Sequence, residues 1–150
     1  MNAQLDMTAP QRVVQSARAY LGTPFMHRGR SKNGIDCAGL ARCACKDAGF
    51  NVPDYLLYGR EPHGGELEAA MERALGAPVM LAPVSMFRLK VGDIVLVRFK
   101  IEPHHVAILT DYQFGGLGVI HADGHNGKVV EHRLAEDMVK RITHVFRIPD

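Results

Sequence analysis

The sequence predicts a single α+β domain over residues 1–150, in which helices come first along the chain and an antiparallel β-sheet follows. Within residues 1–50, apolar side chains recur at helical spacing. After Gly92 the pattern changes to short runs rich in Val and Ile, several of which alternate with polar residues. The glycine pair at 115–116 and the Asn-Gly pair at 126–127 lie between these runs, which favours strands joined by hairpins.

Two helices are expected in the first third of the chain. Thr8 followed by Pro10 is typical of a helix start, and the apolar positions that follow keep helical spacing until Gly22. A stretch with Pro, Gly and Asn-Gly then predicts a loop. The second helix begins at Asp36 or Cys37, at the point where this loop ends.

A long connection and then a series of strands make up the rest of the predicted fold. Residues 52–90 contain many Pro and Gly residues, so we expect a connection with one short helix at 66–75, ended by Gly76. The Val- and Ile-rich runs predict five strands, at residues 93–99, 105–112, 117–122, 128–134 and 143–148.

Charge, cysteine content and the start of the chain limit the expected classes of function. A net charge of +2 is too small to predict binding of nucleic acid, although it is compatible with an acidic polymer. Three cysteines, with Cys43 and Cys45 among alanines of one predicted helix, argue against a disulfide framework. The chain start lacks the basic and apolar regions of a secretory signal, so we expect synthesis in the cytoplasm. No segment is long and apolar enough to predict a membrane span.

Cys37 is the first candidate for chemistry. It lies where a loop becomes a helix, and the unpartnered N–H groups there lower a thiol's pKa and can hold an oxyanion. Gly34 and Gly39 are expected to leave room for a substrate backbone. A small buried residue at a helix start explains the position equally well. Asp36 is expected either to cap this helix or to bind a substrate ammonium group.

A cysteine nucleophile needs a base, and three histidines are candidates. His104 and His105 open one predicted strand and point to opposite faces, but both sets of alternating residues are apolar, so alternation does not choose between them. His121 ends the next strand, where it can lie beside His105 and orient its ring. Asp123 is a further candidate for orienting a ring, whereas His125, His132 and His144 are interpreted as surface or strand residues.

Four motifs in one order resemble the NlpC-type cell-wall cysteine peptidases. They are Asp-Cys-Ala-Gly-Leu at 36–40, Gly-Asp at 92–93, His-Val-Ala-Ile at 105–108 and Ile-His-Ala at 120–122. The resemblance implies a papain-like fold in which the sheet carries both histidines, with Cys37 as nucleophile and His105 rather than His104 as base. It implies cleavage of an amide in the peptidoglycan stem peptide, commonly after γ-linked D-glutamate, without a cofactor.

Two departures from that family fall near the nucleophile. Phe25 replaces a frequent Tyr and Ala38 replaces a frequent Ser, so the substrate subsite to which we assign Phe25, Asp36 and Ala38 has lost two hydroxyls. These losses favour the main alternative, a catalytically weakened structural or wall-binding module. A metal protein that uses His104, His105, His121 and His125 is a third alternative, with poor ligand spacing.

Residues 129–149 further resemble the subgroup that is encoded in phage tail modules. This implies other phage tail proteins as partners, and a virion that carries the chain to the cell wall. The basic residues His27, Arg28 and Arg30 are interpreted as a solvated loop, or as a contact for an acidic stem peptide.

Overall fold

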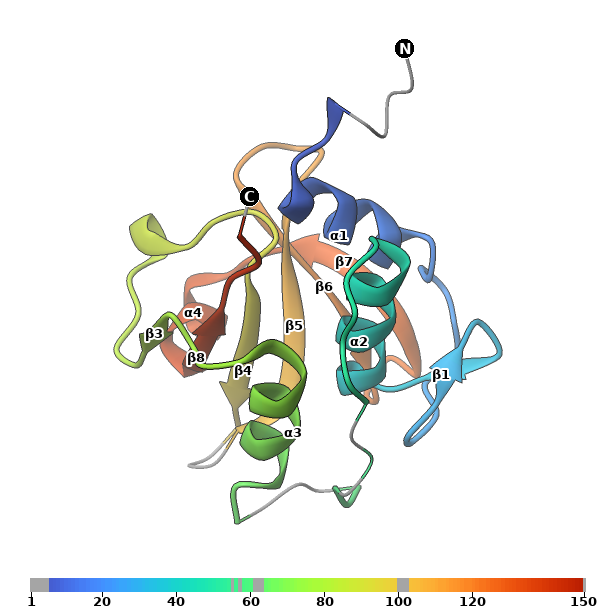
Figure 1. Ribbon diagram of the computed structural model, residues 1–150. Coiled ribbons are helices and arrows are strands. Elements are labelled where there is room, and N and C mark those ends of the chain that lie inside the picture. The colour runs from blue at the N-terminus through green and yellow to red at the C-terminus, as the bar shows by residue number, and fades with distance from the viewer. Residues whose placement is uncertain (1–5, 55, 57, 61–63, 100–102, 150) are drawn as a thin grey trace.

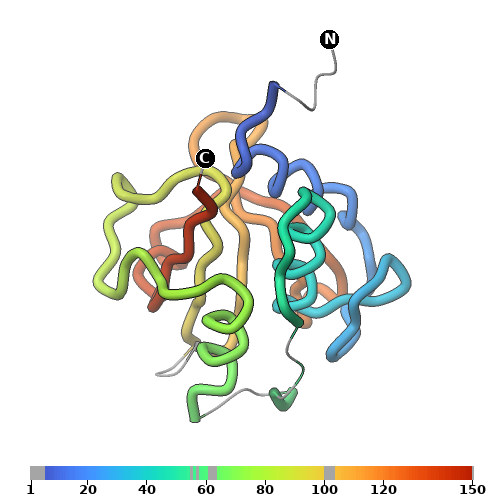
Figure 2. Tube along the Cα trace, in the orientation of Figure 1, coloured from blue at the N-terminus to red at the C-terminus, as the bar shows by residue number. Residues whose placement is uncertain are grey.

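The computed structural model describes residues 6–54, 56, 58–60, 64–99 and 103–149. A six-stranded antiparallel sheet has the strand order β3-β8-β4-β5-β6-β7. Helices α1, α2 and α3 lie on one face of this sheet (Figures 1 and 2). The α+β prediction, with helices first and an antiparallel sheet after, is therefore confirmed.

The three predicted helices are present, and local signals explain their starts. α1 (Ala9–Arg18) begins with a capping box between Thr8 and Gln11. It ends before the predicted Gly22, because the chain tightens into turns after Arg18. α2 (Cys37–Asp47) has Asp36 as its N-cap, and α3 (Glu66–Leu75) has the predicted bounds.

The five predicted strands are all present in the sheet, where β7 forms one edge. They are β4 (Ile94–Arg98), β5 (Pro103–Asp111), β6 (Leu117–Asp123), β7 (Lys128–Arg133) and β8 (Ile142–Phe146). Alternate residues of β4 and β5 belong to two different cores. Leu96, Val106 and Ile108 pack with α1, α2 and α3, whereas Val95, Ala107 and Leu109 pack with Val139 of a fourth helix, α4 (Glu136–Arg141). The sheet is therefore buried on both faces, which is why both sets of alternating residues are apolar.

Some short elements were not predicted. They are α4, the 3-10 turn Met86–Arg88, the edge strand β3 (Met80–Leu81) and the small hairpin of β1 (Arg30–Ser31) and β2 (Gly34–Ile35). β1, β2 and β3 each contain two residues, and α4 contains six. Runs this short are below the length at which periodicity identifies an element. In the part of the chain that the structure describes, helices are too short or too polar to cross a membrane.

The Gly-Asp motif at 92–93 has a structural role. Gly92 has a φ of 90°, and a side chain there would collide with Pro10 at the start of α1. Asp93 is buried, and its two carboxylate oxygens each lie 2.8 Å from a guanidinium nitrogen of Arg147. This motif therefore fixes β4 and the segment after β8 against the first helix.

Candidate active site

The turn before α2 positions Cys37 as the first residue of that helix. Oδ1 of Asp36 accepts a hydrogen bond of 2.8 Å from the Gly39 N–H, which closes the first turn. A side chain at Gly39 would collide with the carbonyl of Gly29, and one at Gly34 would collide with Met26. The room that we expected for a substrate is thus filled by the protein, because the preceding loop packs directly on these glycines.

Asp36 is the centre of a dense hydrogen-bond network. Besides the Gly39 N–H, three donors reach its carboxylate: the N–H of Arg28 at 2.7 Å, the hydroxyl of Tyr58 at 2.6 Å and Nη1 of Arg30 at 3.0 Å. Asp36 is buried, so these bonds compensate for the loss of water around its charge. The cap role of Asp36 is confirmed. Binding of a substrate ammonium stays a prediction, and it would require that one of these donors give way.

The basic residues before the nucleophile serve the same network. Arg28 has a φ of 61°, unusual for a residue with a side chain, and its Nη2 donates to the Tyr58 carbonyl at 2.9 Å. Arg30 is mostly buried and also pairs with Asp54 at 3.2 Å. The interpretation of a solvated loop is therefore wrong for Arg30, whereas Arg28 is exposed to solvent as well as bonded to Tyr58. His27, which lines the cavity described next, packs edge-on against the Tyr58 ring.

One cavity of about 260 Å³ joins the candidate residues. Cys37 and His105 both line it, together with Phe25, Asp36 and Asp123. Among the described residues, no hydrogen bond links the Cys37 thiol to His105, so the two groups share this space without being joined. Catalytic hydrogen bonds are often long or misaligned before substrate binds.

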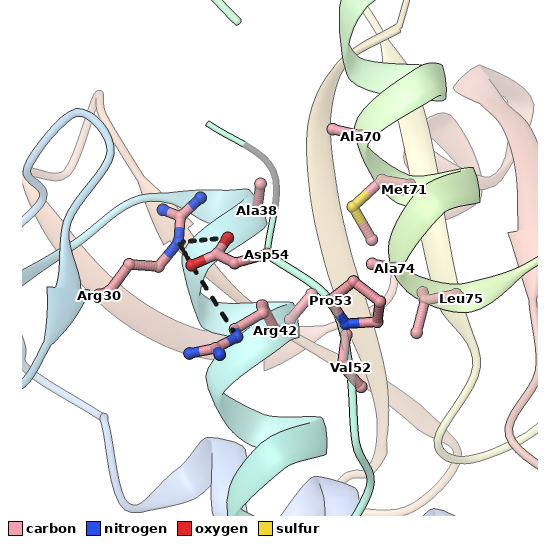
Figure 3. Close-up of a pocket in the computed structure, with 11 residues that line it drawn as sticks. Arg30, Ala38, Arg42, Val52, Pro53, Asp54, Ala70, Met71, Ala74 and Leu75 are labelled. Carbon is pink, nitrogen blue, oxygen red and sulfur yellow. Dashed lines mark hydrogen bonds and ion pairs between the residues drawn. The ribbon is translucent and has the colours of Figure 1, made fainter. Parts of the chain in front are cut away.

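Ala38 lies elsewhere. It is buried and lines a separate cavity beside α3, with Val52 and Met71 (Figure 3). That cavity holds only about 10 Å³, which is room for about one water molecule. Successive helix residues point about 100° apart, so Ala38 faces α3 while Cys37 faces the sheet. We expected Ala38 to line the substrate subsite, but it lines this separate cavity instead.

The environment of the Cys37 thiol differs from the sequence expectation. Burial, and then the charge of Asp36, raise the pKa of Cys37 to about 12. The backbone N–H groups of Val106, Ala38 and Cys37 act in the opposite direction and lower this pKa, but they do not prevail. The helix start thus lowers the pKa of the thiol as expected, but burial and the charge of Asp36 raise this pKa by more. The Val106 contact also places the sulfur against the backbone beside His105.

His105 and His121 form a buried pair on neighbouring strands. Nε2 of His105 lies 2.6 Å from Nδ1 of His121, and the rings meet edge to face at 78°. Burial, and then the neighbouring ring, lower the pKa of His105 to about 3, while Asp123 raises it. The pKa of His121 falls to about 4, first through burial and then through His132. The contact that we predicted between the two histidines is present, and both rings are neutral near pH 7.

The structure also separates His104 from His105. His105 is buried, and it is the one that contacts His121. His104 is partly buried and stacks on Phe99 with the ring centres 6.1 Å apart. The bond to His121 occupies Nε2 of His105, so Nδ1 is the nitrogen left for the Cys37 side.

His132 is a site residue that sequence reasoning missed. Its Nε2 lies 2.9 Å from Nε2 of His121, and its Nδ1 lies 2.9 Å from the Arg133 carbonyl. Val130 is the β7 partner of His121, so His132 occupies the diagonal position two residues further along. A histidine at that diagonal on a neighbouring strand is the signal that could have identified it.

The remaining candidates have structural roles or weaker ones. Asp123 accepts hydrogen bonds from the N–H of His125 and from the side chain of Asn126, and it acts on the rings through its charge. Cys43 and Cys45 are buried and unpaired, as expected for apolar fillers. Within the described ranges, no group of three or more His, Cys, Asp or Glu residues is arranged to hold a metal ion.

Comparison with known proteins gives one family and many solved structures. Residues 22–148 match the sequence model of the NlpC/P60 family. No curated protein sequence matches the chain.

Three solved structures illustrate the shared fold. An NlpC/P60 family protein from Bacillus cereus has a TM-score of 0.66 at 21% identity, over 93% of this chain and 40% of its own. The peptidoglycan hydrolase RipB from Mycobacterium tuberculosis has a TM-score of 0.63 at 21% identity, over 95% of this chain and 65% of its own. The NlpC/p60 domain of the peptidoglycan hydrolase SagA has a TM-score of 0.59 at 21% identity, over 93% of this chain and 98% of its own. This chain thus spans about two-fifths of the Bacillus cereus protein.

Proposed function

This chain belongs to the NlpC/P60 family, and we propose from that premise that it is a cysteine peptidase that hydrolyses an amide bond in peptidoglycan stem peptides. The observation that carries the proposal is that Cys37 and His105 line one cavity, with His121 bonded to Nε2 of His105. RipB and SagA, which share the fold, are peptidoglycan hydrolases, and this supports the substrate class.

The reaction is acyl transfer to water. The pKa of Cys37 is raised and that of His105 is lowered, so the resting pair is a neutral thiol and a neutral imidazole. As the sulfur attacks the amide carbonyl, Nδ1 of His105 accepts the thiol proton. The N–H groups of Cys37 and Ala38, which the helix backbone leaves unpartnered, hold the oxyanion.

The second half of the reaction returns the protein to its starting state. The imidazolium of His105 protonates the leaving amine as the C–N bond breaks, which leaves a thioester on Cys37. Water then attacks the thioester as His105 accepts its proton. The C–S bond breaks and releases the carboxylic acid, and His105 returns the proton to the sulfur of Cys37. His121 keeps the His105 ring oriented through Nε2 in both halves.

The bond and the route of delivery are finer parts of the proposal. The family resemblance favours the bond between γ-linked D-glutamate and a diamino acid, with Phe25 and Asp36 lining the subsite. The resemblance of residues 129–149 to the phage-tail subgroup favours action from a virion in contact with other tail proteins.

The test compares two equivalent substitutions in one helix. Cys37→Ala removes the nucleophile, and Cys45→Ala removes a thiol that is buried in the core. Purified peptidoglycan is incubated with each protein, and the released fragments are identified by mass spectrometry. We expect the wild type and Cys45→Ala to release stem-peptide fragments, and Cys37→Ala to be slower by at least about 1000-fold.

Two outcomes would count against the mechanism. Cleavage by Cys37→Ala at the wild-type rate would remove the cysteine from the reaction. A wild-type protein that sediments with peptidoglycan but releases nothing would favour the wall-binding module instead. The masses of the fragments identify which bond is cut.

A further inference from the structure

We propose that His132 is a positioning residue that fixes the tautomers of His121 and His105 through a directed chain of hydrogen bonds. The proposal deepens the proposed function, because it rests on the role of His105 as the base. The chain runs from the Arg133 carbonyl through three imidazole rings toward Cys37, with distances of 2.9, 2.9 and 2.6 Å between successive partners.

The outer end of the chain determines its direction. A carbonyl oxygen can only accept a hydrogen bond, so Nδ1 of His132 must carry a proton to donate to Arg133. A neutral imidazole has a single N–H group, so Nε2 of His132 is then an acceptor. The carbonyl of Arg133 on strand β7 thus determines which nitrogen of His132 carries the proton.

Each inner link follows from the one outside it. Nε2 of His121 faces an acceptor on His132, so it must donate, and Nδ1 of His121 is left as an acceptor. Nε2 of His105 faces that acceptor, so it carries the proton. Nδ1 of His105 is then unprotonated, which is the form that can take a proton from Cys37.

The alternative tautomers are costly because the contacts are short and the inner rings are buried. Reversing one ring alone would point two lone pairs or two protons at each other across 2.6 or 2.9 Å. An unsatisfied polar group in a buried site is strongly disfavoured. The whole chain therefore changes direction together or not at all.

A proton on His132 would reverse the chain. With both of its nitrogens protonated, Nε2 of His132 becomes a donor, so Nε2 of His121 must accept. Nδ1 of His121 then donates to His105, and the remaining proton of His105 lies on Nδ1, the wrong side for a base.

The other charged groups near the rings do not hold them in either direction. Asp123 acts on His105 and His121 through its charge. The two cavities that His105 lines also contain Cys37, His104, His125, Asp137 and Arg141. On β7, Glu131 is bonded to Arg18 and Thr110, and Arg133 donates to carbonyls of the β5–β6 turn. In the described structure, the three rings are bonded only to one another and to the Arg133 carbonyl.

Three substitutions at His132 separate the directions of the chain. His132→Gln keeps an acceptor for His121, His132→Lys offers only donors, and His132→Leu offers neither. His132 is exposed, so we expect all three variants to fold. The matched control is His144→Leu, a partly buried histidine on β8 that is bonded to Thr143 and not to the chain.

The first measurement is the tautomer of each ring, by NMR of the full chain with ¹⁵N-labelled histidine at neutral pH. We expect His105 to be protonated on Nε2 in the wild type, in His132→Gln and in the control. We expect it to be protonated on Nδ1 in His132→Lys. Identical His105 tautomers in all four proteins would overturn the proposal.

The second measurement is peptidoglycan hydrolysis as a function of pH. At neutral pH we expect kcat to fall about 5-fold in His132→Leu and about 10- to 100-fold in His132→Lys, with KM unchanged. In His132→Gln, which keeps an acceptor for His121, we expect kcat to stay close to that of the wild type. A His132→Lys variant that matches the control in rate would also overturn the proposal.

The two measurements keep this inference apart from the proposed function. A wild-type protein with the predicted tautomers but no hydrolysis would refute the function and leave the chain of rings in place. A protein that hydrolyses peptidoglycan through Cys37 but ignores every change at His132 would refute the chain and leave the function in place.

Discussion

The two sides of the Cys37 cavity are held in opposite ways. On the helix side, one buried carboxylate, that of Asp36, accepts hydrogen bonds from four donors, which lie in the preceding loop, in α2 and at Tyr58. On the sheet side, His105 depends on a single-file chain in which each ring contacts the next at one point. The helix side therefore has several hydrogen bonds to one charged group. The sheet side has one hydrogen bond between each pair of neighbouring neutral rings.

The two arrangements suit two different tasks, which are holding a nucleophile in place and transferring a proton. A nucleophile at a helix start only has to stay in place, so several bonds to one carboxylate are an advantage. A base has to gain and lose a proton, so its surroundings must favour one tautomer without holding the proton permanently. We therefore expect changes on the helix side to alter stability, and changes on the sheet side to alter pH dependence.

The largest effect on folding is expected from Asp36→Ala. The change leaves Arg30 and two backbone N–H groups without their buried acceptor, so the free energy of unfolding should fall by about 3–5 kcal/mol. Urea unfolding at pH 7 measures the loss. The control is Asp111→Ala, which removes an exposed partner of Arg18 and should cost about 1 kcal/mol or less. Equal losses in the two variants would mean that the network around Asp36 is not the main support of α2.

A smaller effect is expected from acid on the sheet side. The pKa values of His105 and His121 are lowered to about 3 and about 4, against an ordinary value of 6.5. Between about pH 6.5 and pH 4, these two histidines bind protons in the unfolded chain but stay neutral in the folded protein. The stability that these rings contribute is therefore complete above pH 6.5 and is lost as the pH falls, by up to about 1.4 kcal/mol per pH unit for each ring.

A double variant isolates that acid effect. In His105→Leu with His121→Leu, the difference in unfolding free energy between pH 7 and pH 5.5 should shrink by about 2.5 kcal/mol relative to the wild type, or about 1.2 kcal/mol for each ring. Chemical denaturation at both pH values measures it, and His144→Leu serves as the control. An unchanged pH dependence in the double variant would show that the two rings are not buried in the neutral form.

Much of the fold could be predicted because its signals are local. Thr8 and Asp36 cap their helices through side chains that are three residues from their partners, and Gly76 ends α3 at the predicted residue. The central strands have runs of β-branched residues. α4 could not be predicted in this way, because it has six residues and is stabilised by packing on the far face of the sheet.

The candidate site was predictable in its parts but not in its environment. Adjacent antiparallel strands are enough to predict that His105 and His121 meet. The pKa of Cys37 depends on burial of the thiol and on the charge of Asp36, which a helix start alone does not reveal. The contact of His132 depends on the register of β7, and the sequence does not specify that register.

The smallest effect is expected from Tyr58→Phe, and it tests the redundancy of the helix side directly. Burial, and then the charge of Asp36, raise the pKa of Tyr58, so its hydroxyl stays protonated and donates at 2.6 Å. That hydroxyl also accepts from Nη2 of Arg30 at 2.8 Å. Removing it deletes one of four donors to Asp36, so unfolding should become easier by only about 1 kcal/mol in urea at pH 7. A loss as large as that of Asp36→Ala would mean that the four donors act as one unit. Loss of a single hydrogen bond would then disrupt the helix side as fully as we propose for the chain of rings on the sheet side.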